Sequence, residues 1–166
     1  MHPGDVTLNA CPLDIPCTWH LAPGTTKGYF RRAQNRVVAR YLDGRTLKGQ
    51  TADFLPTRPT FHVIPSSQIG TSIQVVEVKI ADLKAVFFVK DLVGDAAYNE
   101  AKAFAPEVRA MGRKVQVEFA DGETIVGTTQ GYQPDRPGFF VVPVDPKSNN
   151  DRCFVVMAAV KTVTFL

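Results

Sequence analysis

Two copies of a short motif, Pro-x-Arg-Pro, are the best candidates in this sequence for contact with a ligand or partner. The arginines are Arg58 and Arg136, each placed between two prolines. Because proline restricts its own backbone, each guanidinium is preorganised and loses less entropy when it binds a carboxylate or a phosphate. The alternative is structural: each arginine braces its own loop through backbone carbonyls or a nearby acid, such as Asp53 or Asp135. The sequence leaves both roles open.

A second basic segment, residues 31–36, contains Arg32 and Arg36 at the spacing Arg-x-x-x-Arg. This spacing is similar to that of PilZ domains, where paired guanidinium groups hold the phosphates and guanine edges of cyclic-di-GMP. The accompanying motif of that family, Asp or Asn followed by x-Ser-x-x-Gly, is absent at every serine. Cyclic-di-GMP binding through Arg32 and Arg36 is therefore a minor alternative to a basic strand entry whose arginines extend into water.

One small cluster has residue types that bind metals. Cys11, Cys17 and His20 follow the pattern Cys-x5-Cys-x2-His. A tetrahedral zinc site needs a fourth ligand, which His2 or His62 would supply only through long-range folding. We therefore favour idle or buried thiols over a metal site and predict no metal and no cofactor, although the pattern by itself does not decide the question.

The sequence contains none of the common catalytic motifs. Gly-x-Ser-x-Gly, His-Glu-x-x-His, Cys-x-x-Cys and the phosphate-binding Gly-x-x-x-x-Gly-Lys-Ser/Thr are all missing. His62 lies in an apolar strand-like segment, where a lone histidine is more often structural or solvent-facing than a general base. We therefore predict that the protein is not an enzyme and has no catalytic residues.

Composition indicates a globular protein. The chain has 166 residues, 45% of them hydrophobic, and its net charge of +3 is spread without long runs of one sign. Nucleic acid is thus a permitted partner but not a required one. No segment has the ~20 apolar residues needed to span a membrane, and the N-terminus lacks the pattern of a secretory signal. We expect a cytoplasmic protein without a membrane partner.

The second half of the sequence repeats the first at a nearly constant offset. Asp43 corresponds to Asp121, an offset of 78 (121 − 43), and after a variable loop Lys84 corresponds to Lys161, an offset of 77 (161 − 84). The matched segments are 40–49 with 118–127, 56–65 with 134–143, and 81–89 with 158–166. Such a repeat predicts two copies of one structural unit.

Each copy has the pattern of five short strands. Alternating apolar residues, Asp-Gly pairs typical of tight primed hairpin turns, and an interior glycine typical of a bend all favour a small curved sheet. The expected strands are 37–41, 46–54, 61–64, 75–80 and 85–89 in the first copy, and 114–119, 124–132, 139–142, 152–157 and 162–166 in the second.

The pattern Val-x-x-x-Tyr-x-Asp-Gly-Arg-x-x-x-Gly, followed by Asp53-Phe54, resembles the first motif of Sm-like barrels. The chain also resembles an uncharacterised bacterial domain family associated with signalling proteins, through segments 83–91, 136–140 and 145–150. These resemblances imply a mainly β fold with two tandem five-stranded Sm-like or SH3-like barrels. We expect an extended N-terminal arm (1–34), the first barrel (35–91), a helical connector (92–112) with its helix over 96–104, and the second barrel (113–166).

Tandem small barrels without a catalytic set favour a binding or regulatory module for a protein partner or a small ligand. The two copies differ most in the loops 66–74 and 145–151, so we expect specificity there and take Asn149 and Asn150 as candidate contacts. The alternative is RNA or single-stranded nucleic-acid binding by basic and aromatic residues. Against it, Phe61 and Phe139 occupy equivalent strand positions and are expected in the core. The oligomeric state stays open.

Overall fold

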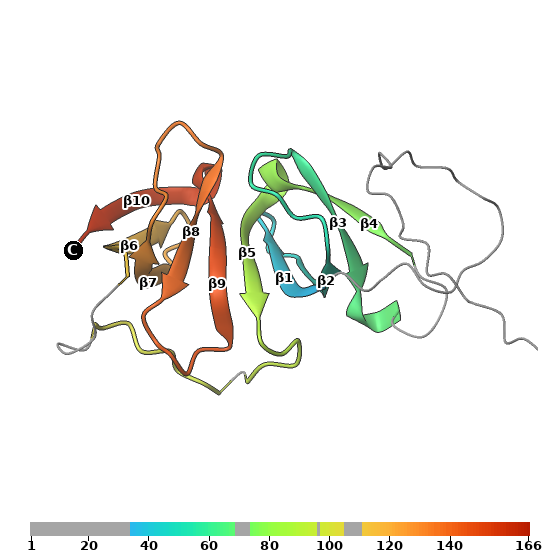
Figure 1. Cartoon of the computed structure of the whole chain (residues 1–166), viewed down its shortest axis with the longest axis horizontal. Helices are drawn as coiled ribbons and strands as arrows, with labels where there is room; N and C mark the ends of the chain where they lie inside the picture. Colours follow the sequence, from blue (N-terminus) through green and yellow to red (C-terminus); the bar gives the residue numbers. More distant parts are fainter. Residues whose placement is uncertain (1–33, 69–73, 96, 105–110) are drawn as a thin grey trace, which may run out of the picture.

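The computed structural model describes residues 34–68, 74–95, 97–104 and 111–166, and their regular structure is almost entirely antiparallel β-strand (Figure 1). All ten strands expected from the sequence are present. They are β1 (Asn35–Tyr41), β2 (Thr46–Thr51), β3 (Thr60–Pro65), β4 (Val76–Lys79), β5 (Leu83–Val89), β6 (Arg113–Phe119), β7 (Thr124–Thr129), β8 (Gly138–Pro143), β9 (Asn150–Val156) and β10 (Val160–Phe165). Short 3-10 turns are η1 (Ser66–Gln68), η2 (Ile80–Asp82) and η3 (Met157–Ala159).

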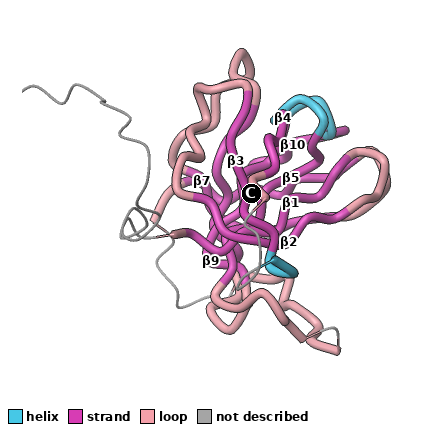
Figure 2. The backbone as a smooth tube through the Cα atoms, turned by 90° about the vertical axis from the view of Figure 1, so that its right-hand side faces the viewer, coloured by secondary structure: helices cyan, strands magenta, loops and turns pink. Residues whose placement is uncertain are grey.

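The strands form one sheet in the order β10-β6-β7-β8-β9-β5-β1-β2-β3-β4. The five strands of each half are consecutive in this order, and the halves are joined where β9 pairs with β5, with Val86 opposite Phe154. Figure 1 shows β9 and β5 side by side in the middle of the molecule and β10 and β4 at its two ends. Figure 2 shows strands running between two ends that are rich in loops.

The strands of the two expected barrels are therefore present, but the sheet is open. A closed barrel requires the two outer strands of a half to bond to each other. In the first half these strands are β4 and β5, and the outer edge of β5 is bonded to β9 instead. The ladder of hydrogen bonds thus continues from one half into the other.

The seam between β5 and β9 is buried on both faces. Alternate residues of β5 enter two different hydrophobic clusters: Val86 and Phe88 join the first, whereas Phe87 joins the second. β9 does the same, because Phe154 lies in the first cluster and Cys153 in the second. Every residue of β5 is consequently buried, which explains why its sequence is apolar at consecutive positions and not only at alternate ones.

The duplication seen in the sequence is reproduced in the strand register. Gly49 lies opposite Val37 between β2 and β1, and Gly127 lies opposite Val115 between β7 and β6. A Cβ atom at either glycine would collide with a carbonyl oxygen of the next strand, that of Ile64 in the first half. The bend predicted at these glycines is thus a site of close contact between backbones.

The Asp-Gly hairpins form, but with a different turn from the expected primed one. The amide of Gly44 donates to the carbonyl of Tyr41 at 3.2 Å, and that of Tyr41 donates to the carbonyl of Arg45 at 2.9 Å. Gly44 is therefore the third residue of the loop, directly after the turn itself, and has a φ of 90°. Gly122 in the second half has the equivalent place and a φ of 87°.

The helix expected in the connector is absent from the described residues 97–104. The amide of Ala101 donates to Asp145 Oδ2 at 2.9 Å and does not take part in a helical turn. Because a single short helix is marginal on its own, this tertiary contact outweighs the helix propensity of the alanines. Of the predicted N-terminal arm, residues 1–33 lie outside the described residues. The described part of the chain contains no helix long and apolar enough to cross a membrane.

We predict that Gly127→Ala lowers the free energy of unfolding by about 1–3 kcal/mol, because the added methyl group has no room against the backbone of β8. Gly131→Ala is the matched control: a Cβ there meets no atom within 4 Å, so the change is expected within about 0.5 kcal/mol. Urea unfolding monitored by circular dichroism measures both. Equal stability of the two variants would contradict the close approach.

Candidate functional site

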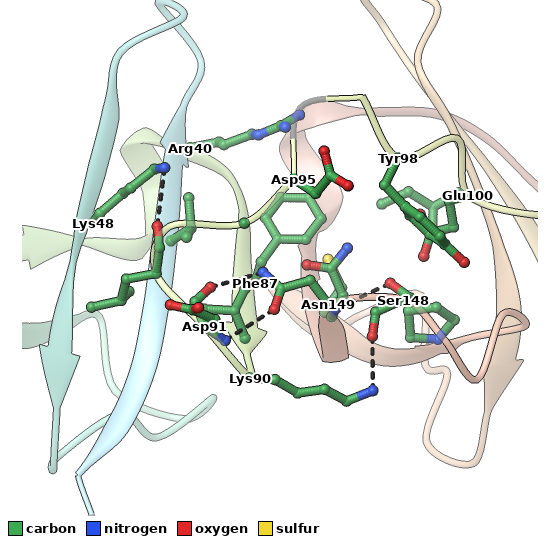
Figure 3. A pocket seen from close by; sticks show the side chains of 18 of the residues that line it. Arg40, Lys48, Phe87, Lys90, Asp91, Asp95, Tyr98, Glu100, Ser148 and Asn149 are labelled. Atoms are coloured by element: carbon green, nitrogen blue, oxygen red, sulfur yellow. Dashed lines mark hydrogen bonds between the residues drawn. The ribbon is translucent and has the colours of Figure 1, made fainter.

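A cleft of about 920 Å³ lies over the seam where the two halves meet (Figure 3). Strands β1 and β2 of the first half provide Arg40 and Lys48, and β5 provides Phe87. The second half provides residues of β7 and of the loop that precedes β9. The connector after β5 borders the cleft with Asp95 and Glu100, among others. The site therefore exists only because the two halves are joined.

Asp145 holds the connector against the second half. Its carboxylate accepts hydrogen bonds from the hydroxyl of Tyr98 at 2.6 Å and from the amides of Ala101 and Lys147, each at 2.9 Å. These bonds, that from Tyr98 above all, hold the pKa of Asp145 below its ordinary value. The same bond raises the pKa of Tyr98 to about 12. The hydroxyl is thus a firm hydrogen-bond donor at neutral pH.

Asn149 fixes the start of the connector through both ends of its side-chain amide. Its oxygen accepts from the amide of Asp91 at 2.9 Å, and its nitrogen donates to the carbonyl of the same residue at 2.8 Å. Lys90 donates to the carbonyl of Ser148 at 2.8 Å (Figure 3). Asn150 begins β9 and also borders the cleft. The loop between β8 and β9 therefore shapes the cleft as well as lining it.

Charged side chains cross from one half to the other beside the cleft. Arg40 pairs with Glu123 at 3.0 Å and lies over the ring of Phe87. Lys84, which is buried, is paired with Glu123 and with Asp121. The contact with Lys84 is the main reason that the pKa of Asp121 is lowered. These pairs stabilise the junction because they compensate for the burial of the lysine.

Glu100 differs from the other acids of the cleft because one of its carboxylate oxygens, Oε1, is buried and has no hydrogen-bond partner among the described residues. Asp91 and Asp95 instead accept from the nearby amides of Val93 and Ala97. A buried carboxylate oxygen without a donor is unfavourable, and a ligand that supplies the donor would remove this penalty. The free oxygen is therefore the strongest chemical feature of the cleft.

Among the described residues, the guanidinium groups of Arg58 and Arg136 have no hydrogen-bond or ion-pair partner, and both residues are exposed. Asp53, considered as a brace for Arg58, binds His62 Nδ1 at 2.7 Å instead. The two loops, which connect β2 to β3 and β7 to β8, lie at the same end of the molecule, at the top of Figure 1. Neither arginine borders the cleft.

The other predicted contacts have different environments. Arg36 donates to the carbonyl of Lys90 at 2.6 Å and so helps to hold the end of β5, while Arg32 lies outside the described residues. Phe61 and Phe139 are buried in the core, as expected. The described part of the chain has no cluster of three residues able to bind a metal. The candidate metal ligands of the sequence lie outside that part, at Cys11, Cys17 and His20.

Sequence reasoning missed Glu100 and Arg40. Glu100 lies in the segment interpreted as a helix, and no local pattern distinguishes it from a solvent-facing helix residue. Arg40 occupies a polar position in an alternating strand, as an ordinary exposed residue would, and only its contact with Glu123 of the other half reveals its role. The variable loop before β9 was the one useful signal, because it includes Asn149.

The comparisons with known proteins give one match. The model of a family of unknown function, DUF6982, matches residues 33–166. The chain belongs to the DUF6982 family. No curated protein and no solved structure matches it. For this DUF6982 protein, function is therefore inferred from its own cleft and surfaces.

We predict that acid releases the connector of this DUF6982 protein only at low pH. The pKa of Asp145 is lower in the folded protein than its ordinary value of 3.8, so its contribution to stability is fully present above 3.8. That contribution is lost as the pH falls through the lower folded value. The chemical shift of the Ala101 amide, followed by NMR as the pH is lowered from about 6 to about 2, reports this transition.

Asp145→Asn should release the connector already at neutral pH, with the Ala101 amide at its acid-state shift. Asp151→Asn, which alters an exposed carboxylate at the start of β9, should leave the Ala101 amide unchanged. An Ala101 shift that moves above pH 3.8 in the parent protein would contradict the assignment.

Proposed function

We propose that this protein is a non-enzymatic binding module that holds a small ligand, or a short segment of a partner, in the cleft between its halves. The observation that carries the proposal is the buried, unpaired Oε1 of Glu100 in a cleft of about 920 Å³. Cavities of ~300–1,000 Å³ are typical of small-molecule sites. The proposal extends the view of tandem barrel-like units as regulatory modules, whose rims and edges serve as binding surfaces.

The chemistry of the cleft selects the class of ligand. Glu100 calls for a hydrogen-bond donor, preferably a cationic amine or guanidinium, because charge-assisted bonds to a carboxylate are the stronger ones. Lys102 and Lys147 also line the cleft and have no ion-pair partner among the described residues, so they suit an anionic group. A zwitterion of amino-acid or peptide type satisfies both requirements.

We predict that Glu100→Gln weakens binding of such a ligand at least tenfold while it does not lower stability. The substitution removes the charge of a half-buried carboxylate that has one buried, unpaired oxygen, so the melting temperature should stay the same or rise. Titration calorimetry with arginine, lysine and short basic dipeptides measures the affinity, and calorimetric melting measures the stability.

Glu77→Gln is the matched control, because it makes the same chemical change at an exposed position of β4 that does not line the cleft. This variant should bind the same ligands as the parent protein. Two results would oppose the proposal: a marked loss of stability in Glu100→Gln, which would indicate a structural role, or unchanged affinity in that variant.

A second candidate function follows from the free guanidinium groups of Arg58 and Arg136. Two exposed arginines in equivalent loops at one end of the molecule suit an extended anionic partner, such as single-stranded nucleic acid. The buried positions of Phe61 and Phe139 remove two of the aromatic rings considered for base stacking, so this candidate rests on phosphate contacts alone.

We predict for this second candidate that Arg58→Ala with Arg136→Ala reduces the affinity for single-stranded RNA at low salt, and reduces the salt dependence by about one to two ionic contacts. Fluorescence anisotropy titrations at salt concentrations from about 20 to about 200 mM measure the affinity and its salt dependence. Arg113→Ala is the control for loss of basic charge elsewhere. RNA that fails to bind the parent protein at the lowest salt would eliminate this candidate.

A further inference from the structure

The two halves are joined head to tail, and this leaves two complementary strand edges. The junction pairs β5, the fifth strand of the first half, with β9, the fourth strand of the second half. The strands left at the ends of the sheet are β4, the fourth strand of the first half, and β10, the fifth strand of the second half. Within the described part of the chain, the edges left open at the two ends of the sheet are thus the same kinds of edge that bond at the seam (Figure 1).

We propose that a second copy of the chain binds at these edges, with β10 of one copy antiparallel to β4 of the next. Transfer of the seam register by the sequence offset places Thr162 opposite Val78 and Thr164 opposite Val76. At the seam the same positions are those of Ala85 opposite Val155 and of Phe87 opposite Cys153. The contact is heterologous, so repetition builds a ring or an open chain and not a symmetric dimer.

Charge complementarity supports this contact. At the seam, Arg40 of the first half pairs with Glu123 of the second. By the sequence offset, Arg40 corresponds to Glu118 and Glu123 to Arg45. At the contact between copies, Glu118 of one chain therefore meets Arg45 of the next, a pair that is again of opposite charge but with the signs exchanged. When one residue of a pair changes sign, attraction is kept only if its partner changes sign too, so this pattern is expected where the two positions form an interface.

A second ion pair of the seam is also preserved, whereas the third, Lys84 with Glu123, corresponds to two residues of like charge, Lys161 and Arg45. Lys84 binds Asp121 across the seam, and the equivalent residues between copies are Lys161 and Asp43. Within one chain these groups are exposed and pair locally, Lys161 with Glu118 at 2.7 Å and Asp43 with Arg45 at 2.6 Å. Docking brings the two local pairs together as a complementary set of four charges, none of which lines the cleft.

Exposed apolar residues lie at the same edges. Phe165 at the end of β10 is 38% exposed, and Val75 just before β4 is 52% exposed. The seam register places Phe165 opposite Val75, because they correspond to Phe88 and Arg152. The contact would cover both, and apolar burial favours association.

The contact between copies is weaker than the seam. Thr162 and Thr164 of β10 stand at the positions of Ala85 and Phe87 of β5, and Glu77 of β4 takes the position that an apolar residue has in β9. Such polar residues on edge strands limit uncontrolled pairing. The association is therefore reversible and depends on concentration and on salt.

Charge reversal of the two partners tests the proposal. Glu118→Arg leaves two guanidinium groups facing each other beside Lys161, so this variant alone should be monomeric at 18.2 kDa. Glu118→Arg combined with Arg45→Glu gives the contact the charges of the seam itself, with two cations on one copy facing two carboxylates on the next, so the double variant should assemble. Sedimentation velocity of the full chain over a range of concentrations at low salt measures the mass.

Controls keep the outcome decisive. Lys102→Glu reverses an exposed charge of the connector, outside both edge strands, and should assemble like the parent protein. Melting curves establish that each variant is folded. If Glu118→Arg is unfolded, Asp43→Lys follows the same logic, because it replaces the carboxylate that faces Lys161 by a cation. The proposal is overturned if the parent protein is monomeric at all concentrations, if it forms only symmetric dimers, or if folded single variants assemble normally.

Discussion

The antiparallel pairing of β5 with β9 is the interaction on which the rest of the structure depends. It turns two five-stranded units into one sheet, and it buries all of β5 and residues 153–156 of β9. Each strand then contributes to both hydrophobic clusters, so neither cluster is complete without residues of the other half. Removal of water from this seam is also what makes the buried Lys84 depend on its two carboxylate partners.

Duplication has been followed by divergence in polar networks. In the first half, Thr51 donates to Asp53, which also binds the ring and the amide of His62. Burial alone would raise the pKa of Asp53, but these hydrogen bonds outweigh it and lower the value. In the second half Gly131 replaces Asp53, and the hydroxyl of Thr129, the counterpart of Thr51, is buried without a partner. The two halves thus share their strands and turns but differ in the hydrogen bonds of their polar side chains.

The cleft is a consequence of the same geometry. Joined side by side, the two halves leave a concave region over the seam. The connector borders it because Asn149 holds its start at Asp91 and Asp145 accepts the hydrogen bond of the Ala101 amide. Oε1 of Glu100 is a buried oxygen of this cleft that has no hydrogen-bond partner among the described residues. A wall held by hydrogen bonds and carrying an unsatisfied acceptor is suited to ligand selection, since ordering entropy already lost on folding is not lost again on binding.

The sequence by itself determined the ten strands, the duplication and the positions of the turns, because these depend on local periodicity and on glycines such as Gly49 and Gly127, which have no side chain to collide with the next strand. From the sequence we predict two closed barrels and a connecting helix. Whether these form depends on the distant partner that each backbone hydrogen bond takes. Only the tertiary structure decided that β5 pairs with β9, that Ala101 binds Asp145, and that Glu100 borders a cleft. Those contacts join residues on the order of 40–70 positions apart, for which the local pattern has no signal.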